Sequence, residues 1–155
     1  MKKQYLIFLA ICSIILIVYS QRKVLLAEIY PEISNGEYHA TISWENQSGE
    51  VSSCKVSISD EKFRSMLETI HVKKHPKLKR MPVVAFEIRL IYKDVAYSIV
   101  VGGDNTISVA QLENLNKTRK FWRDCDGKTF YSLYKLYLDN GGIRIPEIET
   151  YLSEN

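Results

Sequence analysis

The sequence predicts an α+β protein in which an N-terminal membrane-targeting helix precedes one antiparallel sheet of about five strands with two helices, in the order ββαβββα. Three observations lead to this prediction. The chain begins with an uncharged apolar run, several later segments alternate apolar with polar residues, and two segments repeat apolar residues at helical spacing. The expected units are a signal-anchor or transmembrane segment at 1–23, a connector at 24–37, an extracytoplasmic α+β domain at 38–145 and a C-terminal tail at 146–155.

The N-terminal run is the strongest local signal. Residues Tyr5 to Ser20 include no charged side chain, and basic pairs at 2–3 and 22–23 bracket them. A transmembrane helix needs about 17 to 25 apolar residues, so we expect a membrane anchor over residues 5–21. A cleaved signal peptide remains an alternative, because the length of the run and the Val18–Ser20 sequence at its end also suit a cleavage site.

The N-terminal part and the rest of the chain differ in net charge. Residues 1–23 contribute +4 to a net charge of +3, so the remainder carries −1. A generally basic nucleic-acid-binding domain is therefore not expected, and no nucleic acid is expected as a partner. The short N-terminal tail and its positive charges favour a single-pass protein of the cell membrane, with its N-terminus inside and its C-terminal domain outside. Cleavage of the segment would instead release the same domain as a secreted protein.

The first two strands are expected to form a hairpin. Apolar residues occupy every second position of residues 38–45, which is the pattern of a half-buried strand. Gln47–Gly49 suits a three-residue loop with glycine in the left-handed position. This loop fixes the register and places four pairs opposite each other: Trp44 and Ser52, Ile42 and Cys54, Ala40 and Val56, and Tyr38 and Ile58.

A helix is expected next, capped by Ser59 or Asp60, beginning at Glu61 and ending near His71. Its apolar residues recur at the i, i+3, i+4, i+7 spacing of one buried stripe. The final helix is expected from about Lys128 to Leu138, ended by Asn140-Gly141. The apolar stripes of the two helices consist of Phe63, Met66, Leu67 and Ile70, and of Phe130, Leu133, Tyr134 and Tyr137.

Three further strands are expected between the helices. Residues 84–92 and 95–101 alternate on either side of a turn at Lys93-Asp94. A third strand covers 107–109, and its Ile107 and Val109 can lie opposite Val101 and Ile99. In the register that this turn imposes, both strands of the first hairpin place their apolar residues on one face. Glu87 and Arg89 should then point away from the core.

The segment His71 to Arg80 is the most distinctive local feature after the N-terminal run. It holds five basic residues and no acid. An anionic membrane surface or an acidic protein partner would attract such a segment. A solvated connector between helix and strand is the simpler interpretation, because charge runs are commonly exposed linkers. The candidate binding residues are Lys73, Lys74, Lys77, Lys79 and Arg80.

No motif for catalysis, metal binding or cofactor binding is found, and no cofactor is expected. His71 and His75 are four residues apart, but lysines surround them and no nearby carboxylate or cysteine completes a ligand set. The sequence contains neither a G-x-S-x-G motif nor a phosphate-binding glycine loop. A binding or interaction module is therefore favoured over a small hydrolase-like envelope enzyme. A pocket that joins His39, His71 or His75 to a carboxylate would favour the enzyme.

Cys54 and Cys125 belong to the part of the chain that would be exported. In an oxidising compartment two such thiols can pair. A free Cys54 on the apolar face of the sheet is the alternative, since cysteine behaves there as a small hydrophobe. Pairing requires the two Cα atoms to lie about 4.4 to 6.8 Å apart, so the fold decides between these outcomes.

Overall fold

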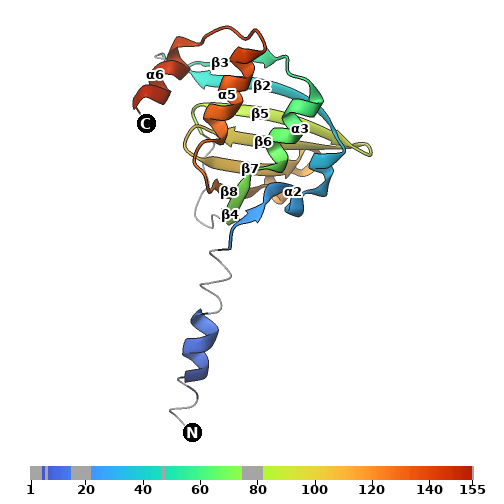
Figure 1. Ribbon diagram of the computed structural model, residues 1–155, viewed down its shortest axis with the longest axis vertical. Coiled ribbons are helices and arrows are strands. Elements are labelled where there is room, and N and C mark those ends of the chain that lie inside the picture. Colours follow the sequence, from blue (N-terminus) through green and yellow to red (C-terminus); the bar gives the residue numbers. More distant parts are fainter. Residues whose placement is uncertain (1–4, 6, 15–21, 47, 75–81, 155) are drawn as a thin grey trace.

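The computed structural model describes residues 5, 7–14, 22–46, 48–74 and 82–154 (Figure 1). The strands are β1 Val24–Leu25, β2 Glu37–Glu45, β3 Val51–Val56, β4 His71–Lys74, β5 Ala85–Tyr92, β6 Val95–Gly102, β7 Thr106–Gln111 and β8 Lys120–Asp124. The helices are α2 Leu26–Ile29, α3 Asp60–Glu68, α4 Leu115–Thr118, α5 Thr129–Asp139 and α6 Pro146–Glu154, with 3-10 helices η1 Pro31–Ser34 and η2 Leu112–Asn114.

The strands form one antiparallel sheet in the order β1-β4-β8-β7-β6-β5-β2-β3. Helices α3 and α5 cross the same face of this sheet, whereas α2 lies beside the edge that contains β1 and β4 (Figure 1). Helix α6 lies near the opposite edge, beside β2 and β3 (Figure 1). The chain enters the sheet through β1, so the N-terminal segment is attached to the edge formed by β1, β4 and β8.

The predicted fold class is wrong in its number of elements. An antiparallel α+β sheet was expected with about five strands and two helices, but the described residues form eight strands and five helices, α2 to α6. The five expected strands are contiguous in the sheet, from β7 to β3. The three additional strands, β1, β4 and β8, extend the sheet beyond β7 and form one complete edge.

The predicted N-terminal transmembrane helix requires a correction. Tyr5 and residues 7–14 are helical, and most of these side chains are exposed. Within the described residues, no helix has the length and the apolar character needed to cross a bilayer. The expected single-pass transmembrane segment is therefore not found among the described residues; residues 6 and 15–21 of the expected anchor lie outside them.

Three predicted strand registers are confirmed. In the β2–β3 hairpin Ile42 lies opposite Cys54, and in the β5–β6 hairpin Ile88 lies opposite Ile99. Ile99 also lies opposite Val109 of β7. These registers are well specified because a shift by one residue would move every apolar side chain to the other face of the sheet.

The core lies between the sheet and helices α3 and α5. It contains the central apolar residues of β5 and β6, while Tyr97 is only partly buried against them. Glu87 is half-buried and Arg89 is exposed, and both belong to the alternate positions of β5, as predicted. The fully buried large side chains include Phe63, Leu67, Phe86, Ile88, Ile99 and Leu133.

Both segments that flank the expected domain are structured. Residues 24–37, expected as a connector, hold β1, α2 and η1, and Leu26 is fully buried. The Leu26 N–H donates to the Ile70 carbonyl at 2.9 Å, which ties this segment to the end of α3. Residues 146–154, expected as a tail, form α6, whose Ile148 is also fully buried. Pro146 at the first helical position favours the start of this helix.

Candidate functional site

Three basic side chains meet in a cleft at the sheet edge to which the N-terminal segment is attached. Lys23 directly precedes β1, Lys73 belongs to β4, and Arg123 belongs to β8. We call this site the basic cleft; its volume is about 310 Å³. Its other lining residues are Asn105, Asp124, Cys125, Asp126 and Gly127.

The pairing of β4 with β8 forces two of these positive charges together. Lys73 lies directly opposite Arg123 in the strand register. Like charges at directly opposite positions of an antiparallel pair destabilise it. In the described part of the chain neither side chain forms an ion pair. A bound anion would remove this repulsion, so the arrangement favours an anionic ligand.

The acidic residues of the cleft do not neutralise it fully. Asp124 is buried, and its Oδ2 accepts a hydrogen bond from the Thr129 N–H at 2.9 Å. Its Oδ1 accepts from the Asp126 N–H at 3.0 Å, so its two carboxylate oxygens bind one backbone amide in the loop before α5 and one at the first residue of α5. Asp126 is exposed at the rim. The cleft thus carries three cations and two acids, one of which is buried.

Cys125 also lines the basic cleft. Burial raises the pKa of the Cys125 thiol, and the positive charges of Lys23 and Lys73 oppose this increase. A thiol is a weak nucleophile compared with its thiolate, so the cleft lacks an activated cysteine.

The structure also shows whether Cys54 and Cys125 form a disulfide. Cys54 and Cys125 are both free and partly buried. Cys54 belongs to β3, which is five strand spacings from β8, or about 24 Å along the sheet at 4.8 Å per strand. A disulfide tolerates no more than about 7 Å between the two Cα atoms, so this fold does not allow the bridge.

Two of the five predicted binding residues have described positions. Lys73 points into the basic cleft, whereas the exposed Lys74 lies opposite Trp122 and does not line it. Lys77, Lys79 and Arg80 lie outside the described residues, as does His75. Lys23 and Arg123 were not among the predicted binding residues, because β1 and β8 were not expected as strands.

A second recess, on the outer face of the sheet, contains a histidine and a carboxylate. It has a volume of about 400 Å³ and spans β2, β3 and β5. His39 lies directly opposite Arg89, and Glu87 lies opposite Thr41. No hydrogen bond or ion pair joins His39 to Glu87 among the interactions of the described residues. No group of three or more metal-ligating residues is found in that part of the chain either.

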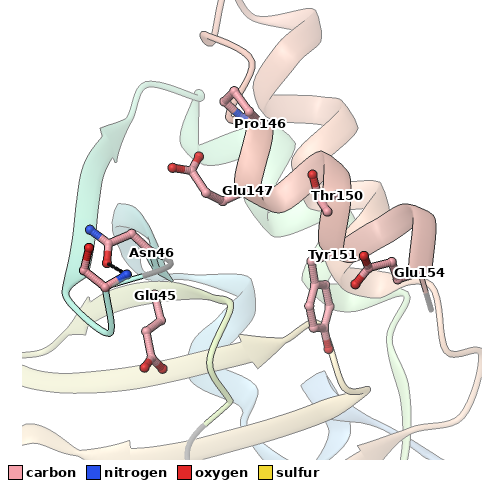
Figure 2. A pocket seen from close by; sticks show the side chains of 8 residues that line it. Glu45, Asn46, Pro146, Glu147, Thr150, Tyr151 and Glu154 are labelled. Carbon is pink, nitrogen blue, oxygen red and sulfur yellow. Dashed lines mark hydrogen bonds between the residues drawn. The ribbon is translucent and has the colours of Figure 1, made fainter.

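The opposite sheet edge carries an acidic recess, which Figure 2 shows from close by. It has a volume of about 610 Å³ and lies between the β2–β3 turn and α6. Glu45, Glu147 and Glu154 line it, and the Tyr151 ring points toward the sheet (Figure 2). Asn46 is occupied by the turn, since its Oδ1 accepts from the backbone N–H groups of Ser48 and Glu50. The two edges of the sheet therefore differ in the sign of their charge.

Comparison with known proteins identifies no relative of this chain. The chemistry of the three sites follows only from the residues that line them; these sites are the basic cleft, the outer recess and the acidic recess. No protein family, curated protein or solved structure matches the chain.

Proposed function

We propose that this chain is an extracytoplasmic binding module, brought to a membrane by its N-terminal apolar segment, and that its basic cleft binds the anionic headgroups of that membrane. One observation carries the proposal. Lys23 of the cleft is the second residue after the apolar segment at 5–21, and the strand β1 that follows Lys23 pairs with β4, which holds Lys73. The attachment to the membrane and the cations that would contact it therefore belong to the same edge of the domain.

Charge along the sheet supports this orientation. The domain beyond residue 23 carries a net charge of −1, so a negative surface would not attract it as a whole. Its basic edge would be attracted and its acidic recess repelled, which turns the basic cleft toward the membrane. Each basic residue close to an anionic surface contributes about 1 kcal/mol. The attraction acts over about 8 to 10 Å at physiological salt, so it needs the cleft at the surface.

Binding of this kind uses groups that the cleft contains. Arg123 offers a planar guanidinium that can bind a phosphate in a bidentate manner, and Lys23 and Lys73 act as point charges. Burial raises the pKa of the Cys125 thiol, so the cleft does not activate this cysteine as a nucleophile. A hydrolase-like enzyme is the second candidate function, on the single observation that His39 and Glu87 share the outer recess. Hydrolysis of a model ester that His39→Ala abolishes and Lys73→Gln leaves intact would favour that alternative.

The test of the proposal is vesicle binding by the full chain. The apolar segment contributes to binding of any bilayer, so the informative quantity is the preference for phosphatidylglycerol over phosphatidylcholine vesicles. We expect the double variant Lys73→Gln, Arg123→Gln to lose about 2 kcal/mol of this preference, or about 30-fold in relative affinity. The remaining preference should depend less on salt.

A matched control neutralises the same number of charges elsewhere. Lys62 on α3 and Lys135 on α5 are exposed and lie outside the basic cleft. The variant Lys62→Gln, Lys135→Gln should retain the preference for anionic vesicles. Equal losses in both double variants, or no loss in either, would show that the cleft does not bind the surface.

The side of the membrane is tested separately. We expect a reporter fused to the C-terminus to be active outside the cytoplasm, because the positive charges and the short tail at the N-terminus favour export of the domain. Alkaline phosphatase and a fluorescent protein that matures only in the cytoplasm form a suitable pair. Activity of the cytoplasmic reporter alone would contradict the proposed location.

A further inference from the structure

Strand β3 forms an unpaired edge of the sheet. Among the described strands it pairs with β2 only. The Asn46 N–H donates to the Glu50 carbonyl at 2.9 Å, and hydrogen-bonded and non-hydrogen-bonded pairs alternate from there along the hairpin. The backbone N–H and C=O groups of Val51, Ser53 and Lys55 therefore point away from β2. No described residue forms a hydrogen bond with these outward groups, so another strand can bind them.

The side chains at this edge leave it accessible and partly apolar. Val51 is 75% exposed and Ile143 is 79% exposed, the two highest values among the large apolar residues described beyond residue 23. Val51 lies on the outer face of β3. Ile143 lies on the inner side, because its N–H donates to the Tyr137 hydroxyl at 3.0 Å and that oxygen is 3.7 Å from Cys54 Sγ. A strand added to β3 would cover apolar surface on both faces of the sheet.

The sequence of β3 offers little protection against pairing with another strand. Exposed edge strands are usually very short, or are protected by proline, a bulge or charged side chains. β3 has six residues, VSSCKV, with no proline and with Lys55 as its single charge. Its pairing with β2 is continuous and contains no bulge. The opposite edge strand, β1, has only two residues. β3 is therefore the edge that is suited to pairing.

A second copy of the chain complements this edge. Two β3 strands related by a two-fold axis at Ser53 run antiparallel, with Ser53 opposite its own copy and Val51 opposite Lys55 of the second copy. All the outward backbone groups are then hydrogen-bonded. An axis at Cys54 would leave Val51 unpaired, and an axis at Lys55 would place two ammonium groups opposite each other, which destabilises a strand pair. The axis at Ser53 is therefore favoured.

The same register brings opposite charges together. Val51 lies opposite Glu45 in the β2–β3 pairing, so Glu45, Val51 and Lys55 of the second copy follow one another across the outer face. The apolar stem of this lysine can cover the exposed Val51 and direct its ammonium group toward the Glu45 carboxylate. Glu45 is exposed, so it is accessible to this contact. The two-fold axis forms the contact twice.

We propose that β3 pairs with β3 of a second copy, so that the two sheets join into one continuous antiparallel sheet. Because β3 and β1 lie at opposite ends of each sheet, the two β1 strands lie at the two ends of the joined sheet (Figure 1). The dimer therefore joins copies held by two facing membranes, a step that rests on the membrane binding proposed above. The pairing itself uses no residue of the basic cleft.

Cysteine crosslinking of the full chain in detergent tests the pairing without the membrane proposal, because no bilayer orients the copies there. The parent protein carries Cys12→Ser and Cys125→Ser, which leaves Cys54 as the single thiol. Position 52 lies opposite Cys54 of the second copy in a non-hydrogen-bonded pair, with Cα atoms about 4.5 Å apart, where a disulfide can form. We expect Ser52→Cys to give a disulfide-linked dimer on mild oxidation.

Two matched proteins should form little of this dimer. Ser65→Cys places the second thiol at an exposed position of α3, away from the edge. The parent protein has Cys54 alone, and the two copies of Cys54 are diagonal neighbours about 7 to 8 Å apart in the proposed register. If Ser52→Cys crosslinks no faster than Ser65→Cys, the proposal is wrong. Rapid crosslinking of the parent protein would likewise overturn the register at Ser53.

A proline at the centre of the edge separates strand pairing from chance collision. Ser53→Pro, added to the Ser52→Cys protein, removes an N–H that points away from β2, and proline is tolerated in an edge strand at such a position. It should lower the rate of crosslinking about 10-fold, because both hydrogen bonds at the two-fold axis are lost. Ser53→Thr, which keeps the N–H, should crosslink normally. Urea unfolding checks that the proline variant folds, and normal crosslinking by the folded variant would contradict the pairing.

Charge reversal gives a test that does not depend on the proline variant. In the Ser52→Cys protein, Lys55→Glu should slow crosslinking because it faces Glu45 of the second copy with a like charge. Glu45→Lys in the same chain should restore the rate, since the contact is then re-formed with its charges exchanged. A reversed pair that crosslinks no faster than Lys55→Glu alone would overturn the proposed register.

Discussion

Replacement of Phe86 by alanine is expected to lower the free energy of unfolding by about 3 to 5 kcal/mol, as is typical of large aromatic residues in a core. Phe86 is fully buried in β5, where it lies opposite both Ile42 and Val101. Its ring centroid is 5.4 Å from that of Phe130 on α5. The substitution therefore removes contacts both within the sheet and between the sheet and its helical layer.

This loss is large relative to the total stability of a domain, which is about 5 to 15 kcal/mol. Urea unfolding of the full chain, followed by circular dichroism, measures it. Ile91 on the same strand provides the control, since its side chain is 40% exposed and lies outside the core cluster. Ile91→Ala should cost much less than Phe86→Ala. Similar losses for the two variants would contradict the assigned inner face of β5.

Stability is also expected to fall steeply in strong alkali. Tyr38 is the clearest case, because burial raises the pKa of its hydroxyl from 10.0 to about 12. The neutral hydroxyl donates a hydrogen bond to the Ile33 carbonyl, which ties β2 to η1. Burial also raises the pKa values of Tyr134 and Tyr137, which pack between α5 and the rest of the core.

Ionisation of Tyr38 destabilises the folded chain, because folding raises the pKa of its hydroxyl. The unfolded chain loses the tyrosine proton more readily than the folded chain, so ionisation favours unfolding. The contribution of Tyr38 is fully present below pH 10 and disappears as the pH rises through about 12. A shift of this size corresponds to about 2 to 3 kcal/mol for one residue. Urea unfolding at pH 9 and pH 12 measures the combined effect of the buried tyrosines.

A tyrosine variant separates this effect from general alkaline damage. Tyr38→Phe should be less stable than the wild type at pH 9, because the Ile33 carbonyl loses its donor, but its stability should fall less between pH 9 and pH 12. Tyr131 is 57% exposed, and Tyr131→Phe should keep the wild-type pH dependence. The same pH dependence in all three proteins would contradict the role of Tyr38.

The five strands that alternate clearly could be predicted from the sequence, together with their registers. In β5, apolar residues at 86, 88 and 90 alternate with Glu87 and Arg89, so only one register buries the apolar set. The β2–β3 loop was equally informative, because Asn46 and Gly49 close it with the hydrogen bond expected of a short turn.

The edge strands could not be predicted in the same way. β4 has the sequence His-Val-Lys-Lys, in which a single apolar residue is flanked by charge, and this pattern resembles a linker. Its strand conformation depends on β8, about 50 residues later in the chain, and β1 depends in turn on β4. Helix α6 was not predicted for a different reason. Ile148, Tyr151 and Leu152 have helical spacing, but the segment begins at Pro146, a residue that breaks a helix interior and yet suits its first position.

The candidate site was predicted only in part. Lys73 was identified because it belongs to a run of basic residues, which is visible in a linear sequence. Lys23 and Arg123 were not, because the pairing of β1, β4 and β8 brings them together from three distant parts of the chain.

The short length of β1 has a mechanical consequence. Any tension transmitted from the N-terminal segment reaches the domain first through two residues, Val24 and Leu25, which pair with Val72 and His71. The hydrogen bonds of such a short strand can break one after another. The longer, eight-residue pairing of β5 with β6 lies far from the point of attachment and is not the first to bear the tension. Leu26 is the first fully buried residue after β1. Tension on the N-terminal segment would therefore separate Lys23 from Lys73 before it disturbs the core. The affinity of the basic cleft for an anion would then fall as the tension rises.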